Sequence, residues 1–199
     1  MSDVKPVRVG VLGSTRGSAM RPIVAAWEQN TLGIDLSVVV SNRKAASILD
    51  FARENNIPAF SISAKDRERE EFDREVSQKL QDYGVQLVLM IGYMRIVSAP
   101  FVKEWRGRLI NIHPSLLPRH GGLMDLEVHR SVLKAGDSES GCTLHLAEEE
   151  VDAGQIVLQK KCPVFPNDTP ETLKERVQAL EGEAFLDLLR NPRNYLELD

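Results

Sequence analysis

The fold is decided by one stretch of the chain, Leu109-Ile110-Asn111-Ile112-His113-Pro114-Ser115-Leu116-Leu117-Pro118. Its apolar start predicts a buried strand over Leu109–His113. In an extended backbone, residues two apart point to the same face, so Asn111 and His113 should project together. Pro114 cannot donate to a sheet ladder and biases His113 away from the helical region. The stretch therefore predicts two polar side chains fixed at the end of a strand, as on the floor of an active site.

Strands and helices alternate on the N-terminal side of this stretch and just beyond it. The expected strands are Val7–Gly13, Ile34–Ser41, Ile57–Ser61, Gln86–Ile91 and Leu109–His113. The expected helices are Ala19–Gln29, Ala45–Asn55, Asp66–Tyr83 and Leu126–Ala135. Such alternation predicts an α/β protein with a doubly wound, mostly parallel sheet.

The C-terminal part of the chain follows a different pattern. Thr143–Leu146 and Ile156–Lys160 read as strands with no helix between them, so this edge of the sheet should be antiparallel. Asp168-Thr169-Pro170-Glu171 then predicts a helix start, with Asp168 as the cap and Glu171 completing a capping box. This helix should run to about Leu189. There is no repeat or interdomain linker, so residues 1–199 are expected to form a single domain.

Composition and charge exclude several classes of protein. The 199 residues carry a net charge of −4 with both signs mixed, which disfavours a nucleic-acid-binding face but allows a small phosphorylated ligand. Cys142 and Cys162 have no CxxC spacing, so neither a disulfide framework nor a metal site is expected. Met1–Pro6 lacks an apolar signal region, and no apolar run approaches the ~18 residues of a membrane span. These features predict a cytoplasmic protein with no membrane partner.

A small-residue turn, Ser14-Thr15-Arg16-Gly17-Ser18, separates the first strand from the first helix. A turn of this kind can bind phosphate, because backbone N–H groups at a helix start point at the anion and the helix dipole favours it. The turn matches neither G-x-G-x-x-G nor the P-loop pattern. The alternative is a tight turn that needs glycine and binds nothing.

Asn111, His113 and Asp152 form the candidate catalytic set. Asp152 lies in the acidic loop Glu148–Gly154, which could fold over the other two. A histidine, a carboxylate and an amide suit acyl transfer to an amine, which needs donors for an oxyanion and an acceptor for the proton of the attacking nitrogen. The alternative is that Asn111 and His113 only satisfy buried backbone groups.

Two motifs give the chain a resemblance to a known family. Asn111-Ile-His-Pro-Ser-Leu-Leu-Pro118, followed by Val151-Asp-Ala-Gly154, resembles the folate-dependent formyltransferases over nearly the whole chain. Gly17-Ser18, Gly92–Val97, and Pro163-Val164 ahead of Asp168 look most like the members that act on phosphoribosylglycinamide in purine biosynthesis. The resemblance implies a Rossmann-like formyltransferase fold, with the ribonucleotide phosphate on the N-terminal half and the folate on the C-terminal half.

The resemblance also implies a reaction. The glycine amine of phosphoribosylglycinamide would attack the formyl carbon of 10-formyltetrahydrofolate, a co-substrate, and no metal would take part. Asn111 and a protonated His113 would stabilise the oxyanion. Asp152 would orient His113 and assist proton transfer.

Binding roles follow from the same resemblance. Those implied for the ribonucleotide are Gly17, Ser18, Ala19 and Glu181. Those implied for the folate are Arg69, Met94, Arg95, Ile96, Val97 and Asn111. His145 would support the site. Taken alone, Arg69 and Glu181 could equally be exposed helix charges, and His145 an ordinary strand histidine.

The chain departs from the family pattern in two places. Ala19 stands where the usual phosphate turn has asparagine, and Arg16 is a nearby charge that could compensate. The segment Arg119–His129 is longer than its family counterpart, so no substrate contact is assigned to it.

Three other functions fit parts of the sequence. The same three residues could serve another folate-dependent formyltransferase or a formyltetrahydrofolate hydrolase, which would place water where the amine sits. A non-catalytic nucleotide-binding module would not need them together. A serine or cysteine hydrolase is disfavoured, since Ser115 lacks the G-x-S-x-G elbow and Cys142 shows no sign of activation. Monomer and homodimer both remain open.

Overall fold

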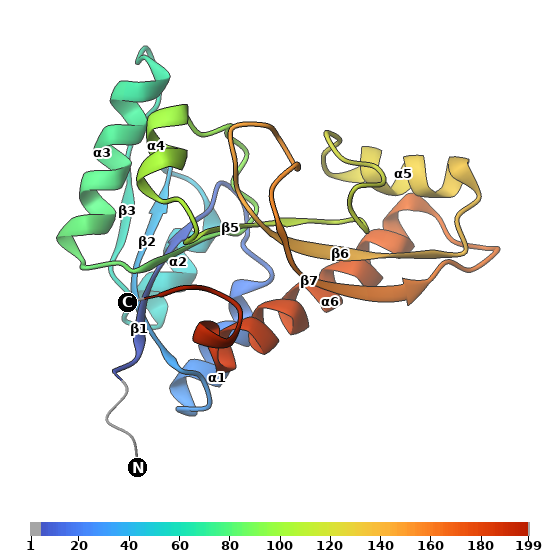
Figure 1. Ribbon diagram of the computed structural model, residues 1–199, viewed down its shortest axis with the longest axis horizontal. Coiled ribbons are helices and arrows are strands. Elements are labelled where there is room, and N and C mark those ends of the chain that lie inside the picture. The colour runs from blue at the N-terminus through green and yellow to red at the C-terminus, as the bar shows by residue number, and fades with distance from the viewer. Residues whose placement is uncertain (1–4, 199) are drawn as a thin grey trace.

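Seven strands form one sheet in the order β3-β2-β1-β4-β5-β6-β7 in the computed structural model, which describes residues 5–198 (Figure 1). The strands are β1 (Val7–Leu12), β2 (Ile34–Ser41), β3 (Ala59–Ser61), β4 (Leu87–Met90), β5 (Leu109–His113), β6 (Glu139–Leu146) and β7 (Ile156–Pro163). The helices are α1 (Met20–Glu28), α2 (Ser47–Glu54), α3 (Arg69–Asp82), α4 (Ala99–Glu104), α5 (Leu126–Ala135), α6 (Pro170–Arg190) and the short 3-10 helix η1 (Pro192–Asn194).

The direction of the strands confirms the predicted fold class. β1 pairs in parallel with both β2 and β4, and the parallel pairing continues to β3 on one side and β5 on the other. β5, β6 and β7 pair antiparallel, which is the C-terminal edge expected from the sequence. The chain leaves β1 toward β3 and then returns to β4 on the opposite side of β1. A doubly wound sheet binds ligands at such a reversal, outside the carboxyl ends of the strands.

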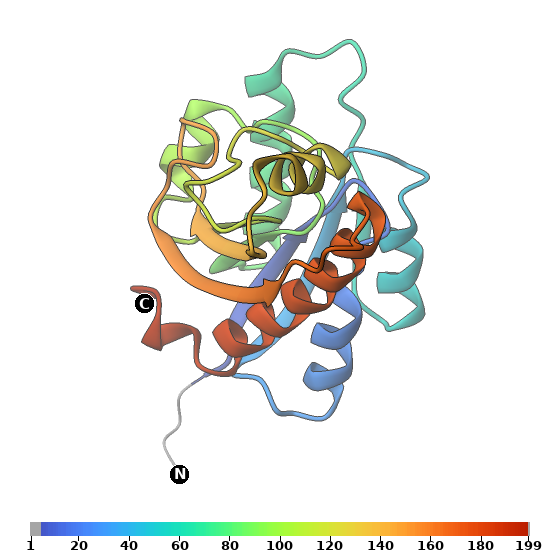
Figure 2. The ribbon, with the colours of Figure 1, turned by 90° about the vertical axis from the view of Figure 1, so that its right-hand side faces the viewer.

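Two apolar clusters cover the two faces of the sheet. One combines β1 with α1, α2 and α6, and includes Ile23, Leu49 and Phe185. The other combines the opposite side of the strands with α3 and α4, and includes Phe72 and Trp105. Figure 1 shows α3 and α4 together on one side, and Figure 2 shows the long α6 running beside α1. The sheet is therefore the middle of three layers, and its strand ends carry the functional side chains.

The predicted elements are present, with differences at some boundaries. The helix α4 was not predicted, because six residues with Pro100 in the first turn give too short a periodic pattern. β6 begins at Glu139, four residues earlier than expected, since pairing with β7 reaches back to that residue. β7 continues to Pro163 for the same reason.

The prediction that Asp168 caps the last helix is wrong. Thr169 is the N-cap, and its capping box is completed by Thr172 rather than Glu171. Asp168 instead forms a two-pronged ion pair with Arg176, at 2.7 and 2.8 Å. These contacts hold the pKa of the Asp168 carboxyl well below its usual range.

The cysteines and the helix lengths bear on two of the predictions made from composition. Cys142 and Cys162 are both buried free thiols. Across residues 5–198, none of the helices combines the length and the apolar character needed to cross a bilayer.

Candidate active site

A cleft of about 930 Å³ opens at the strand reversal. Its walls come from the segments that follow β1, β4 and β5, from the loops around Gly122 and Asp152, and from one face of α6. Every predicted site residue except Ala19 lines this cleft: Gly17, Ser18, Arg69, Met94, Arg95, Ile96, Val97, Asn111, His113, His145, Asp152 and Glu181. Ala19 is buried behind the turn, where it is the N-cap of α1.

His113 and Asp152 form the centre of the site. Nδ1 of His113 lies 3.1 Å from Oδ2 of Asp152, and both side chains are almost fully buried. The backbone N–H of Gly122 donates to the same carboxylate oxygen at 2.9 Å. Burial opposes ionisation of Asp152, but the hydrogen bonds from His113 and Gly122 outweigh it and keep the pKa of Asp152 below its usual value.

The second nitrogen of His113 is also held. Its Nε2 lies 3.0 Å from the backbone carbonyl oxygen of His120. A carbonyl and an ionised carboxylate only accept hydrogen bonds, so each ring nitrogen faces an acceptor. These two contacts therefore fix the orientation of the imidazole ring in the cleft.

Asn111 is oriented by His145, its neighbour across the β5–β6 pair. Nδ1 of His145 faces the carbonyl oxygen of Leu146 at 3.0 Å, and Nε2 lies 3.1 Å from Nδ2 of Asn111. Burial lowers the pKa of His145, which favours the neutral ring with its hydrogen on Nδ1. Nε2 also lies 3.5 Å from Asp152, but the shorter contact with Asn111 decides its role as an acceptor. One amide hydrogen of Asn111 is thus occupied, and the other remains for a ligand in the cleft.

The turn after β1 is tied to the loop after β4 by Ser14. Its hydroxyl donates to Oδ1 of Asn42 at 2.6 Å and accepts from the backbone N–H of Met94 at 2.9 Å. Gly17 has φ +62°, and a Cβ there would lie 2.5 Å from Cδ1 of Ile48. Both the left-handed φ and the contact with Ile48 therefore favour glycine at this position.

The loop after β4 gives the cleft an apolar rim, and one arginine from this loop and one from α3 lie beside it. Met94 and Ile96 are exposed, while the guanidinium of Arg95 lies 4.6 Å from the centre of the Phe72 ring. Arg69 is the first residue of α3 and also faces the cleft. A flat, partly apolar molecule with anionic groups would match this wall.

One face of α6 forms the opposite wall. Lys174, Gln178 and Glu181 recur at helical spacing and all line the cleft. Lys174 forms an ion pair with Asp125 at the start of α5. Burial raises the pKa of Glu181 to about 7, against the opposing effect of Lys174. The charge of Glu181 thus changes near neutral pH.

His129 is a further titratable group in the cleft. It is 1% exposed, and its Nδ1 has no hydrogen-bond partner among residues 5–198. Burial, followed by repulsion from Lys174, lowers the pKa of His129 to about 4, so the ring is neutral at physiological pH. It contributes a neutral polar wall beside His113.

Sequence reasoning missed Ser14, Asp125, His129, Lys174 and Gln178. The spacing of Lys174 and Gln178 with Glu181 was a signal that could have identified the face of α6. Ser14 and Asp125 had no such signal, because their partners lie far away in the sequence.

Gly154 is required for the loop that carries Asp152. A Cβ at this position would lie 1.8 Å from the carbonyl oxygen of Leu146, so the backbone would have to move. We expect Gly154→Ala to cost about 2 kcal/mol, equivalent to a fall of roughly 4–8 °C in Tm. Calorimetry measures this directly. Gly121→Ala is the control, because its Cβ would meet nothing closer than 3.3 Å; an equal loss of Tm there would contradict the close-approach explanation.

Comparisons with known proteins are consistent with this geometry. Residues 7–189 match the formyl transferase family. The chain is 38% identical over 176 residues to phosphoribosylglycinamide formyltransferase of Escherichia coli strain K12, covering 88% of this chain and 82% of that protein. It superposes on the crystal structure of glycinamide ribonucleotide transformylase 1 from Symbiobacterium toebii with a TM-score of 0.89 at 35% identity, covering 95% of this chain and 88% of the other.

A longer protein contains a region similar to this chain. The chain is 42% identical over 181 residues to the trifunctional purine biosynthetic protein adenosine-3 of Drosophila melanogaster. That match covers 89% of this chain but 13% of the relative's length. The family match over nearly all of the sequence, together with the agreement in fold, leads to one conclusion: this chain belongs to the formyl transferase family.

Proposed function

We propose that this protein transfers a formyl group from 10-formyltetrahydrofolate to the glycine amine of phosphoribosylglycinamide, a step of purine biosynthesis. The observation that carries the proposal is the arrangement of Asn111, His113 and Asp152. Two hydrogen-bond donors and one carboxylate meet at one point of a cleft that also reaches the turn at Gly17. The names of the relatives from E. coli and S. toebii support the same substrate.

The proposed chemistry uses each of the three groups once. The amine nitrogen bonds to the formyl carbon, and the carbonyl oxygen becomes an oxyanion. The free amide N–H of Asn111 donates to this oxyanion, and a protonated His113 stabilises it by its charge. Asp152 accepts the proton that the amine must lose, either directly or through a water molecule. The bond from the formyl carbon to the folate nitrogen then breaks, and the proton passes to that nitrogen. The products are the formylated amine and tetrahydrofolate, with no net change in protons.

The substrates are proposed to occupy opposite ends of the cleft. Gly17 and Ser18, with Ala19 at the start of α1, would hold the ribose phosphate through backbone N–H groups. Arg16, which also lines the cleft, adds positive charge where the family's asparagine is absent. Glu181 would accept hydrogen bonds from the ribose hydroxyls.

The folate is proposed to lie along the loop after β4. Met94, Ile96 and Val97 offer the apolar surface that a fused ring requires, and Arg69 and Arg95 offer charges for carboxylates. We further propose a cytoplasmic location, where free thiols such as those of this chain stay reduced.

The proposed role of Glu181 predicts a pH dependence of substrate binding. With a pKa of about 7, its carboxylate is mostly protonated at pH 6 and mostly charged at pH 8. Because the charged form is the better acceptor, KM for phosphoribosylglycinamide should fall by up to about tenfold between these values. Glu181→Gln should retain only the part of the change in KM that comes from titration of the substrate phosphate. A fall in KM of equal size in wild type and Glu181→Gln would contradict the role.

Transfer can be separated from hydrolysis in a single assay. Purified protein is incubated with 10-formyltetrahydrofolate, with and without phosphoribosylglycinamide, while tetrahydrofolate and the formylated amine are both measured. We expect tetrahydrofolate to appear only with the amine and in equal amount to the new amide. Deformylation without the amine would establish a hydrolase, and binding of both compounds without turnover would establish a non-catalytic module.

A further inference from the structure

The carbonyl oxygen of His120 determines how the His113 ring is oriented. It accepts from Nε2 of His113 at 3.0 Å, on the side of the ring opposite Asp152. Because both ring nitrogens are held, the imidazole cannot rotate about its Cβ–Cγ bond without losing one of these hydrogen bonds. The position of this carbonyl therefore sets the position of Nδ1, which faces Asp152 and the reacting centre.

The backbone of His120 adopts a conformation that is unfavourable for a residue with a Cβ atom. Its φ is +59°, in the left-handed region where a Cβ is unfavourable. Other contacts must therefore hold it there. The loop that precedes it is bound to the sheet, because Oγ1 of Thr143 donates to the carbonyl of Ser115 at 2.6 Å and accepts from the N–H of Leu117 at 3.0 Å.

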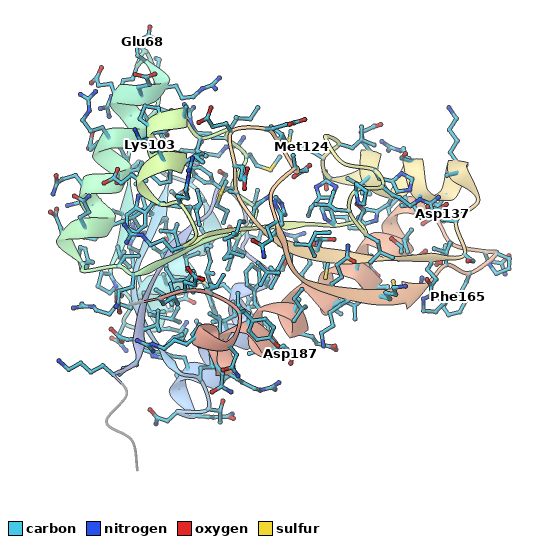
Figure 3. The ribbon with its side chains drawn as sticks, in the orientation of Figure 1. Glu68, Lys103, Met124, Asp137, Phe165 and Asp187 are labelled. Atoms are coloured by element: carbon cyan, nitrogen blue, oxygen red, sulfur yellow. The ribbon has the colours of Figure 1, made fainter. Side chains whose placement is uncertain are left out.

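The side chain of His120 supplies the remaining contacts. Its Nε2 lies 2.8 Å from Oδ2 of Asp137, and its Nδ1 lies 2.8 Å from the hydroxyl of Ser131. Asp137 also forms an ion pair with Arg119, the residue before His120. Figure 3 labels Asp137 where the chain leaves α5. The His120 side chain is 10% exposed and that of Asp137 6%, so these bonds are shielded from water.

The same group of residues borders a second, smaller cavity of about 100 Å³ behind the loop. This cavity contains neither His113 nor Asp152 among its lining residues, although His120 and Asp137 are part of its wall. The His120 side chain is therefore directed away from the catalytic cleft, while its carbonyl oxygen bonds to His113. The side chain of His120 thus lines the small cavity, while its carbonyl oxygen contacts the residue at the centre of the large cleft.

We propose that His120 is a positioning residue for His113: its side chain, held by Asp137 and Ser131, fixes the carbonyl oxygen that orients the catalytic imidazole. The inference rests on the proposed function for its kinetic consequence. Its structural consequence, the state of the His113 ring, does not depend on what the enzyme catalyses.

The kinetic experiment uses three variants and a control. His120→Phe keeps the ring volume but removes both side-chain bonds, so we expect kcat to fall about 10–100-fold while KM for each substrate changes less than about threefold. Asp137→Asn retains an acceptor for His120 and should lose less than His120→Phe. Ser131→Ala should lose least. Glu139→Gln, another wall residue of the small cavity, pairs with Lys161 rather than His120 and should leave kcat unchanged.

The structural experiment uses the small number of histidines. The chain has four, so ¹⁵N-histidine labelling gives four imidazoles to assign. In the wild type, the Nε2–H of His113 should exchange slowly with water; in His120→Phe it should exchange faster, while the Nδ1–H of His145 stays protected. If His120→Phe does not fold, Asp137→Asn replaces it in both measurements.

The outcomes separate this inference from the proposed function. An altered His113 signal in a protein with no transferase activity would support the positioning role and refute the proposed reaction. An active enzyme whose His113 signal and kcat are unchanged in His120→Phe would overturn the positioning role alone. A rise in both KM values that matches the loss of kcat would indicate general distortion and would also overturn it.

Discussion

Replacing His113 with alanine is expected to lower kcat at least ~100-fold. The substitution removes the donor that the structure holds between Asp152 and the carbonyl of His120. An imidazole fixed in this way needs no reorganisation when charge develops on the formyl oxygen nearby, and that is why its removal is costly. The measurement is steady-state turnover with saturating folate and amine.

Two controls make the His113 result interpretable. The Tm of His113→Ala should be recorded, because removing a buried ring leaves a cavity that can destabilise the fold by itself. Folate binding should be measured by titration, since the proposed folate wall lies on the loop after β4 rather than on β5. A folded, folate-binding variant that turns over at nearly the wild-type rate would refute the catalytic assignment.

Asp152→Asn is the second substitution with a large expected effect, again at least ~100-fold in kcat. Asparagine preserves the shape of the side chain but loses the negative charge. It can neither take the proton from the amine nor offer His113 a charged acceptor. Because the pKa of Asp152 is already below its usual value, the wild-type carboxylate stays charged throughout the neutral range, and the loss should be similar at pH 6 and pH 8.

Asp152 also contributes to the stability of the fold, and its lowered pKa determines the pH range in which it does so. A carboxyl whose pKa is lowered by folding stabilises the native state above its unfolded pKa of about 3.9 and ceases to do so as the pH falls through the native pKa. Asp152→Asn should therefore lower Tm at pH 7 and have less effect near pH 3. Asp50→Asn on α2 is the matched control, because Asp50 is exposed and pairs with Arg53 three residues away. A recovery of activity at any neutral pH would count against the proton-acceptor role.

The fold was predictable because its signals are local. Alternating strand and helix patterns predicted the parallel part of the sheet, and the missing helix after β6 predicted its antiparallel edge. The pairing of Asn111 with His113 followed from the two-residue period of a strand. Asp152 was found because its loop carries a recognisable motif, and the fold brings that loop to the end of β5.

The parts that could not be predicted depend on contacts between distant segments. Ser14 forms hydrogen bonds with a residue 28 positions away and with another 80 positions away. The periodic pattern of apolar residues along the sequence does not indicate such pairs. His120 contacts the His113 ring through its backbone carbonyl, a group that every residue type has, so a pattern of side chains gives no sign of the contact. The cap of α6 was assigned to Asp168, but this side chain pairs with Arg176 inside the helix, and Thr169 is the cap instead.

The hydroxyl of Ser14 has a consequence for how the two substrates influence each other. It joins the turn proposed for phosphate to the backbone of Met94 in the loop proposed for folate, with Asn42 as the third point of attachment. The backbone N–H of Ser14 also donates to the carbonyl oxygen of Gly92 at 3.0 Å, so one residue joins the two segments twice. Any factor by which bound folate changes the affinity for the ribonucleotide must equal the factor by which bound ribonucleotide changes the affinity for folate. Ser14 therefore lies on the direct contact by which the two halves of a bisubstrate site can be coupled.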